Sequence, residues 1–389
     1  MKRIKQFIVM AVVALVGTAT VSISPASAGP VSLACGSTHT GSSSGSPYNL
    51  SGGVTGCTNN GITLAGANYT FDLNGNDVSC VDGTPGDGVA IHITGTNITL
   101  IDSSTGNAGE VQFCDVGVLI SGAPVRQAFN TVDGIDVHKN QGDQCLTTGG
   151  DGILMDVSDR NTVKNNVVTE NGPYGGITIL GGSSYNTVDN NDVNDNAWPV
   201  MCTPAATAFY YYETDGIRLE PNAKNNTISN NRVARSGLDG IAVFNPTVSQ
   251  PDNPQNPQDP QNFNNFVTGN TLTDNGTTVP PSEPGYTFQE AREGDGIRVF
   301  DAAVANQIND NTVCGSQGNG IYAGVGGNFL NDNKSGTVAE CGANDNHKAG
   351  TANGYWDLND SDLPPGPGPC TNVWMGNTAT HVNVTCTLL

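Results

Sequence analysis

The stretch TDGIRLEPNAKNNTISNNRV at residues 214–233 is followed by LDGIAVF at residues 238–244, which repeats its opening motif. Each unit contains a D-G-I triplet and, 10 or 11 residues later, an element of the form N-T-V/I-x-N-N. Two short runs of alternating apolar residues, separated by Gly, Asn and Asp, predict two short β-strands per unit. Because such strands cannot bury an apolar face alone, the units are expected to stack on one another.

The repeat recurs over most of the chain. Triplets that match D-G-I or a close variant lie at residues 133–135, 151–153, 175–177, 215–217, 239–241, 295–297 and 319–321. A coil of about 18 to 25 residues, with Ile and Val inward and Asn at the bends, is typical of a solenoid. The prediction is an all-β, single-stranded right-handed parallel β-helix with terminal caps and three long loop insertions.

Two polar features of the repeat have structural explanations. A ladder of stacked side chains, one from each coil, is expected at Asn166, Asn191, Asn231, Asn270, Asn311 and Asn333. The Asp of D-G-I is expected to hydrogen-bond its own turn, and Gly allows the bend. Calcium binding by the Asp column is the alternative.

The domain organisation follows the repeat. A basic start, an apolar run and the small residues Ala26-Ser27-Ala28 predict a signal peptide over residues 1–28. Residues 29–60 are expected to form an N-terminal cap, residues 61–345 the β-helix and residues 346–389 a C-terminal cap. The three insertions occupy residues 198–213, 245–262 and 277–294.

Charge and cysteine content limit the partners and the compartment. Three of the 15 Lys and Arg residues precede residue 29 and all 36 Asp and Glu residues follow it, which leaves a formal charge of 12 minus 36, or −24. This charge disfavours nucleic acid, and no segment predicts a membrane span. Ten Cys residues favour disulfides in a secreted, monomeric protein, with sequential pairs 35–57, 80–114, 145–202, 314–341 and 370–386.

A resemblance adds to this interpretation. The segment YTFDLNGNDVSCVDGTPGDGVAIHITGTNITLIDSS at residues 69–104 resembles the opening coils of bacterial secreted right-handed β-helix repeat proteins. That broad group includes NosD-like proteins and polysaccharide lyases and epimerases. The resemblance implies the fold, but the fold carries many activities.

Outward-facing positions on the D-G-I strands supply the candidate site. If the Ile points inward, the residues one and three places later point outward. The first outward column then contains Asp136, Arg218 and Arg298, and the second contains His138, Asp156, Glu220, Phe244 and Phe300. The insertion at residues 198–213 adds Tyr210, Tyr211 and Tyr212. Charged groups with aromatic walls are suited to binding a polysaccharide.

Two chemistries and one non-catalytic role are consistent with this set. β-Elimination or C5-epimerisation of a uronate would use His138 as base and Arg218 to neutralise the carboxylate, with Asp136 or Asp156 tuning His138 or holding Ca²⁺. DGIDVHKN is similar to the D-P-H signature of alginate C5-epimerases at Asp136 and His138, although Val137 replaces the Pro. Glycoside hydrolysis by Asp156 and Glu220 is disfavoured, because two coils separate them by roughly 10 Å. The alternative is an extracellular glycan-binding or structural protein without catalysis.

Overall fold

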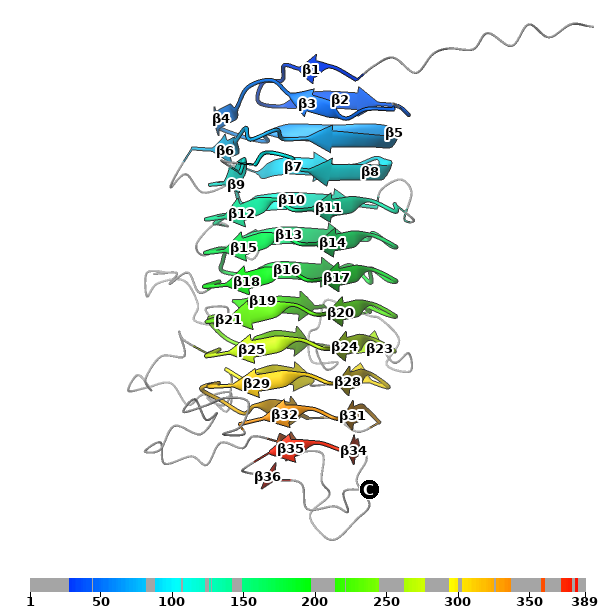
Figure 1. The fold of residues 1–389 in the computed structure, drawn as a ribbon, viewed down its shortest axis with the longest axis vertical. Helices are drawn as coiled ribbons and strands as arrows, with labels where there is room; N and C mark the ends of the chain where they lie inside the picture. Colours follow the sequence, from blue (N-terminus) through cyan, green and yellow to red (C-terminus); the bar gives the residue numbers. More distant parts are fainter. Residues whose placement is uncertain are drawn as a thin grey trace, which may run out of the picture.

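The computed structural model describes residues 28–43, 45–81, 88–105, 108–122, 126, 128–141, 149–196, 214–220, 222–244, 262–276, 294–299, 303–324, 327–336, 358–360, 372–379 and 382–383. Within these ranges the chain is all-β and forms the predicted solenoid, with parallel strands stacked coil upon coil (Figure 1). Three faces run along the solenoid axis and are called sheets A, B and C here. No helix in the described ranges is long and apolar enough to cross a membrane.

Sheet B contains the D-G-I strands. Its members are β2 (Ser37–Gly41), β5 (Ile62–Asp72), β7 (Val89–Ile93), β10 (Val116–Ser121), β13 (Asp151–Asp156), β16 (Gly175–Leu180), β19 (Asp215–Leu219), β22 (Ile241–Val243), β26 (Ile297–Val299), β30 (Ile321–Ala323), β33 (Leu358–Asp360) and β36 (Val382–Asn383).

Sheet A follows sheet B in each coil and contains the N-T-V/I strands. Besides the long β5, which it shares with sheet B, it consists of β1 (Pro30–Val31), β3 (Tyr48–Leu50), β8 (Thr96–Ile101), β11 (Thr131–Asp133), β14 (Thr162–Lys164), β17 (Thr187–Asp189), β20 (Thr227–Ser229), β24 (Phe266–Thr268), β28 (Gln307–Asn309), β31 (Phe329–Asn331) and β34 (Val373–Met375).

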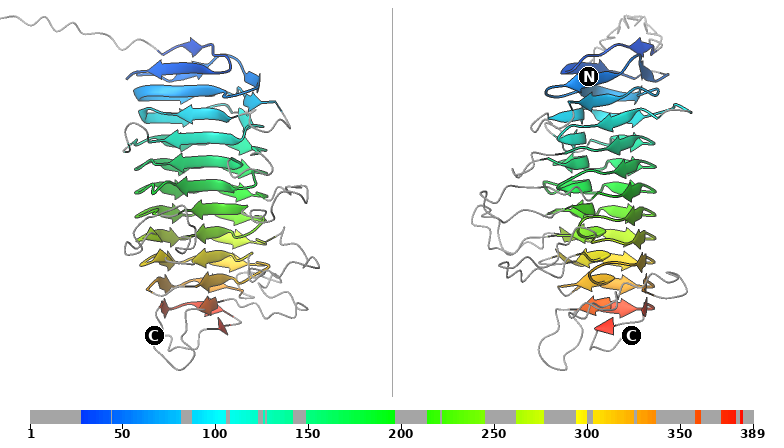
Figure 2. Two further views of the ribbon diagram at one scale, coloured as in Figure 1. Left: turned by 180° about the vertical axis from the view of Figure 1, so that it is seen from behind. Right: turned by 90° about the vertical axis from the view of Figure 1, so that its left-hand side faces the viewer.

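Sheet C has one strand from each of 11 coils in the described part of the chain. Its strands are β4 (Val54–Cys57), β6 (Val78–Cys80), β9 (Glu110–Gln112), β12 (Asp136–His138), β15 (Val167–Thr169), β18 (Asp192–Asn194), β21 (Arg232–Ala234), β25 (Thr271–Thr273), β29 (Thr312–Cys314), β32 (Lys334–Ser335) and β35 (Thr378–Ala379). A two-stranded sheet pairs β23 (Asn262–Phe263) with β27 (Ala303–Val304). Figure 2 shows the same stack from two further sides.

The interior is filled by the apolar residues of all three sheets. Ile153, Ile177 and Ile217 of sheet B are in register and fully buried. Val163 and Val188 of sheet A form a similar buried column. Burial of these columns stabilises each coil only together with its neighbours, as the short strands predict.

The predicted Asn ladder is confirmed. The Asn166 side-chain amide donates to the Asn191 side-chain oxygen at 2.9 Å, Asn191 donates to Asn231 at 2.9 Å, and the series continues through Asn270, Asn311 and Asn333. A second ladder, made by the first Asn of N-T-V/I, runs through Asn161, Asn186, Asn226, Asn265, Asn306, Asn328 and Asn372. These bonds satisfy amides that would otherwise be buried without partners.

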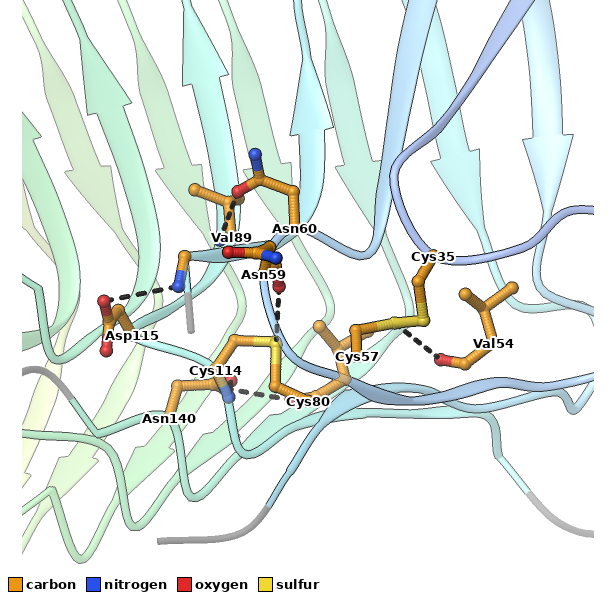
Figure 3. Close-up of a disulfide and its surroundings, with 12 residues drawn as sticks. Cys35, Val54, Cys57, Asn59, Asn60, Cys80, Val89, Cys114, Asp115 and Asn140 are labelled. Carbon is orange, nitrogen blue, oxygen red and sulfur yellow. Dashed lines mark hydrogen bonds between the residues drawn. A yellow bond between two sulfur atoms is a disulfide. The ribbon is translucent and has the colours of Figure 1, made fainter. Parts of the chain in front are cut away.

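Two of the predicted disulfides lie in the described residues and are confirmed. Cys35 is bonded to Cys57 and Cys80 to Cys114, with Cα atoms 5.4 and 4.9 Å apart (Figure 3). Cys314 is also disulfide-bonded, but its predicted partner at position 341 lies outside the described residues. The pairs 145–202 and 370–386 lie outside them as well.

Candidate functional site

The outward face of sheet B carries buried charged side chains over five successive coils, from β13 to β26. Arg218 and Arg298 of the predicted first column do share one column, whose members in register are Leu154, Thr178, Arg218, Ala242, Arg298 and Tyr322. Arg218 is only 4% exposed and Thr178 is fully buried, although both occupy outward positions. These two side chains are therefore shielded from solvent by other parts of the protein.

A kink at the Gly of D-G-I brings the preceding Asp to this outward face. A Cβ at Gly152 would lie 2.6 Å from the Gly176 carbonyl oxygen, 2.7 Å from the Val168 Cγ1 and 2.8 Å from the Asn171 Nδ2, all of them interior. The Gly therefore faces inward beside the inward Ile, and the Asp before it contacts the outward column. The sequence argument, which alternated strictly from the Ile, did not include these Asp residues in the site.

The predicted hydrogen bond of each Asp to its own turn is not what these residues form; their bonds go to the next coil. Asp215 Oδ1 accepts the backbone N–H of Asp239 at 3.0 Å, and Asp239 Oδ1 accepts that of Asp295 at 2.7 Å. Asp295 in turn accepts the Asn319 side-chain amide at 2.8 Å. Each Asp thus links its coil to the next with one carboxylate oxygen.

Arg218 of β19 is the centre of the cluster. Its Nη1 donates to Asp215 Oδ2 at 3.0 Å, and its Nε donates to Glu220 Oε1. The guanidinium carbon lies 5.2 Å from the ring centre of Tyr174 and 4.9 Å from that of Phe244. Two carboxylates and two aromatic rings therefore compensate one buried cation.

Asp151 of β13 is a buried carboxyl with a strongly altered proton affinity. Burial raises the pKa of Asp151 to about 7, against the opposing effects of a hydrogen bond from Thr178 and the positive charge of Arg218. The charge of Glu220 adds to the rise. A carboxyl with a pKa near neutrality can donate or accept a proton at physiological pH.

A second charged group lies further along sheet B. Arg298 Nη1 is 3.8 Å from Asp239 Oδ2, and Arg298 Nε is 3.9 Å from Asp295 Oδ2. Burial raises the pKa of both Asp residues, and the neighbouring Asp239 carboxyl raises that of Asp295 further, while Arg298 opposes both shifts. The Arg298 guanidinium carbon lies 5.5 Å from the ring centre of Tyr322.

The placement of His138 and Asp136 in this site was wrong. Both belong to β12 of sheet C, in register with β15, whereas Arg218 belongs to sheet B. The triplet at 133–135 completes an N-T-V element: Thr131 pairs with Thr162, and Asp133 pairs with Lys164 of sheet A. The letters N-T-V immediately before the triplet are the signal that identifies its true register.

On sheet C, His138 has its own polar neighbours. Its Nε2 lies 2.8 Å from the Gln112 side-chain oxygen and 3.6 Å from Glu110 Oε2, and its Nδ1 lies 3.6 Å from Asp136 Oδ1. Burial raises the pKa of Asp136, which His138 opposes and Glu110 enhances. These contacts connect neither residue to the Arg218 cluster.

The other predicted residues have mixed outcomes. Asp156 ends β13 in register with Leu180 of sheet B, and burial raises its pKa. Glu220 and Phe244 contact Arg218, as described above. Phe300, Tyr210, Tyr211 and Tyr212 lie outside the described residues. In the described part of the chain, no group of three or more His, Cys, Asp or Glu residues is arranged to hold a metal ion, so no residue there is assigned to Ca²⁺.

Residues 53–352 match the family described as right handed beta helix region. No curated protein sequence matches the chain. Among solved structures, the Dettilon tailspike protein is similar at 15% identity and a TM-score of 0.47, over 82% of this chain and 54% of the tailspike. A mutant of the periplasmic alginate epimerase AlgG is similar at 18% identity and a TM-score of 0.42, over 65% of this chain and 47% of the epimerase. Pectate lyase Pel9A is similar at 16% identity and a TM-score of 0.43, over 84% of this chain and 70% of the lyase.

This chain spans about half the length of the tailspike and of the epimerase. At these identities and TM-scores, nothing about this chain is concluded from the three solved structures. The family match covers most of the repeat region that the sequence predicted. The chain belongs to the right-handed beta helix family.

Proposed function

We propose that this protein acts outside the cytoplasm on a polysaccharide, by general acid–base chemistry at the outward face of sheet B. One observation carries the proposal. A carboxyl with a pKa of about 7, Asp151, lies in the field of Arg218, which binds a second carboxylate, Glu220, between aromatic rings. Disulfides at the N-terminal coils support an oxidising compartment.

The roles follow from the protonation states. Hydrolysis of a glycosidic bond uses one protonated carboxyl as acid and one ionised carboxylate as base or nucleophile. Asp151 supplies the first, because its raised pKa keeps a large fraction protonated at neutral pH. Glu220, which accepts a hydrogen bond from Arg218 Nε, is proposed for the second role. Asp151 and Glu220 lie two coils apart, roughly 10 Å along the axis, so of the two geometries only inversion, with a water between the carboxyls, approaches this spacing. The rings of Tyr174 and Phe244 would flank the sugar.

Uronate lyase or C5-epimerase activity is the second candidate. It requires a cation for the substrate carboxylate, and Arg218 and Arg298 lie two coils apart on one face, roughly 10 Å along the axis. Both arginines already face two protein carboxylates, so a uronate would have to displace one of them. The charge balance therefore favours hydrolysis of the glycosidic bond.

The experiment is to incubate the purified full chain with neutral and uronate polymers, with Ca²⁺ and with EDTA. New reducing ends without ultraviolet absorbance indicate hydrolysis, and absorbance of an unsaturated uronate indicates a lyase. Asp151→Asn should lower turnover at least about 100-fold and retain binding. Asp133→Asn on sheet A is the matched control and should leave turnover unchanged.

Two results would contradict the proposal. Turnover by Asp151→Asn at the wild-type rate would remove Asp151 from the chemistry. Binding of a glycan without turnover of any polymer would instead favour the non-catalytic role that the sequence left open.

A further inference from the structure

We infer that Phe129, Arg160 and Tyr185 form a binding site for an acidic sugar residue of a polysaccharide, separate from the charged cluster on sheet B. These three residues are called the aromatic column here. They lie on three successive coils at the turn that joins sheet B to sheet A. Thr131, Thr162 and Thr187 are in register, so the residues two places before them stack along the axis in steps of about 4.8 Å.

The backbone at the aromatic column is in the left-handed region, which bulky side chains disfavour. The φ angles are 53° at Phe129, 63° at Arg160 and 60° at Tyr185. The same turn on other coils also has positive φ, but there the residues are Asn97, Asn225, Asn264, Ala305 and Gly327. Asn and Gly adopt this conformation more readily than aromatic residues or Arg. Three neighbouring coils therefore carry side chains that local conformation does not favour.

The aromatic column is exposed and stacked. Phe129 is 48% and Tyr185 53% exposed. The guanidinium carbon of Arg160 lies 5.7 Å from the Phe129 ring centre and 4.9 Å from the Tyr185 ring centre. A guanidinium that stacks on aromatic rings keeps its in-plane N–H donors available for a further partner.

Arg160 differs from the other arginines of the described ranges in its charge environment. Those arginines each lie within ion-pair distance of at least one carboxylate: Arg126, Arg218, Arg232, Arg235 and Arg298. In the same described ranges, no carboxylate lies within 4.0 Å of the Arg160 guanidinium. The chain has 36 acidic and 15 basic residues, so an exposed arginine without an acidic neighbour stands out.

The chemistry of the aromatic column indicates the class of ligand. A planar guanidinium held in place binds a carboxylate through two parallel hydrogen bonds. Exposed aromatic rings on either side offer apolar faces to a sugar ring. A uronate residue has both a carboxylate and an apolar ring face, so a uronate-bearing chain fits the aromatic column. The inference does not rest on catalysis at Asp151, because binding here needs no turnover.

The test is calorimetric titration of the full chain with a galacturonate hexamer, with cellohexaose as the neutral probe. The double variant Phe129→Asn/Tyr185→Asn and the single variant Arg160→Asn should each weaken hexamer binding at least about 10-fold. Asn suits the left-handed backbone, so melting temperatures should not fall. The control Phe266→Thr removes an exposed aromatic residue of sheet A and copies its register partner Thr227; it should bind as the wild type does.

Wild-type binding of the hexamer should weaken as salt concentration rises, because an exposed ion pair is screened. Unchanged affinity in both Asn variants, or no binding by the wild type, would overturn the inference. Equal affinity for cellohexaose, or binding of a sulfated hexamer but not of the galacturonate hexamer, would likewise overturn it. Asp151→Asn should still bind the hexamer, so failure of the proposed catalysis remains distinguishable.

Discussion

Arg218 places a permanent positive charge where water is almost absent. Asp215 and Glu220 bind the guanidinium from two sides, and Tyr174 and Phe244 lie against it. The free energy of such a group depends on its partners, because a buried charge without compensation is costly. The partners of Arg218 therefore determine both the stability and the chemistry of this face.

Truncation of Arg218 should destabilise the protein strongly. Arg218→Ala leaves two buried carboxylates without their cation, and we expect a loss of about 3 to 5 kcal/mol in the free energy of unfolding. Lys164→Ala is the control, since Lys164 forms a partly exposed ion pair with Asp133 at 3.2 Å, for which a loss below about 1 kcal/mol is expected. Denaturant titration measures both; similar small losses would mean that Arg218 is solvated.

Asp151 should make stability depend on pH. Its pKa is about 7 in the folded protein and near 3.8 in the unfolded chain, so between these pH values the folded state binds more protons. Stability is then fully present below about pH 4 and is lost as pH rises to about 7, by at most about 1.4 kcal/mol per pH unit. Asp151→Asn should flatten this part of the profile and Asp133→Asn should not. Identical slopes for wild type and Asp151→Asn would contradict the raised pKa.

At the scale of the elements, a strand of sheet B turns its Asp outward because the next residue is Gly. At Gly240, as at Gly152, a Cβ would enter the interior: it would lie 2.6 Å from the Gly296 carbonyl oxygen and 2.7 Å from both Asn275 Nδ2 and Leu272 Cδ2. Backbone atoms cannot yield as a flexible side chain can. The kink is thus a packing requirement of the coil and also places Asp239 near Arg298.

Gly240→Ala should destabilise the pairing of β22 with the strands on either side of it. We expect a loss of about 1 to 3 kcal/mol or more, since overpacking forces the backbone of the adjacent coil to shift. Gly52→Ala is the control, because a Cβ there meets nothing within 4 Å. Thermal unfolding compares the two variants. If Gly240→Ala unfolds at the wild-type temperature, the interior has room for the added Cβ and the packing argument is wrong.

At the scale of the whole molecule, each coil contacts mainly the coils beside it. The two disulfides bind the first coils together: Cys57 of β4 pairs in register with Cys80 of β6, and each is bonded to a further level of the stack (Figure 3). Their effect should therefore be local to the N-terminal end.

Removal of one disulfide tests this locality. Cys80→Ala/Cys114→Ala should lower the stability of the N-terminal coils by about 2 to 4 kcal/mol. Hydrogen exchange should accelerate in peptides that contain β6 and β9 and stay nearly unchanged in those that contain β20 and β21. Equal acceleration along the whole solenoid would show that the coils unfold as one unit.

The sequence by itself determined the architecture. Short alternating strands at a fixed period have one stable solution, stacking, and this predicted the solenoid, the ladder from Asn166 to Asn333 and two disulfides. It also predicted the outward column of Arg218 and Arg298, because side chains alternate along a regular strand.

Only the tertiary structure decided the site. Strict alternation of side chains fails at the kinked Gly. Asp151 and Asp239 therefore lie on the outward face of sheet B, although the sequence argument did not place them there. His138 lies in sheet C because the letters D-G-I occur at two different places in a coil. Only the pairing of whole coils shows which of the two places a given triplet occupies. The pKa of Asp151 and the charge balance of Arg218 depend on burial and on partners from other coils, and these contacts exist only after the chain has folded.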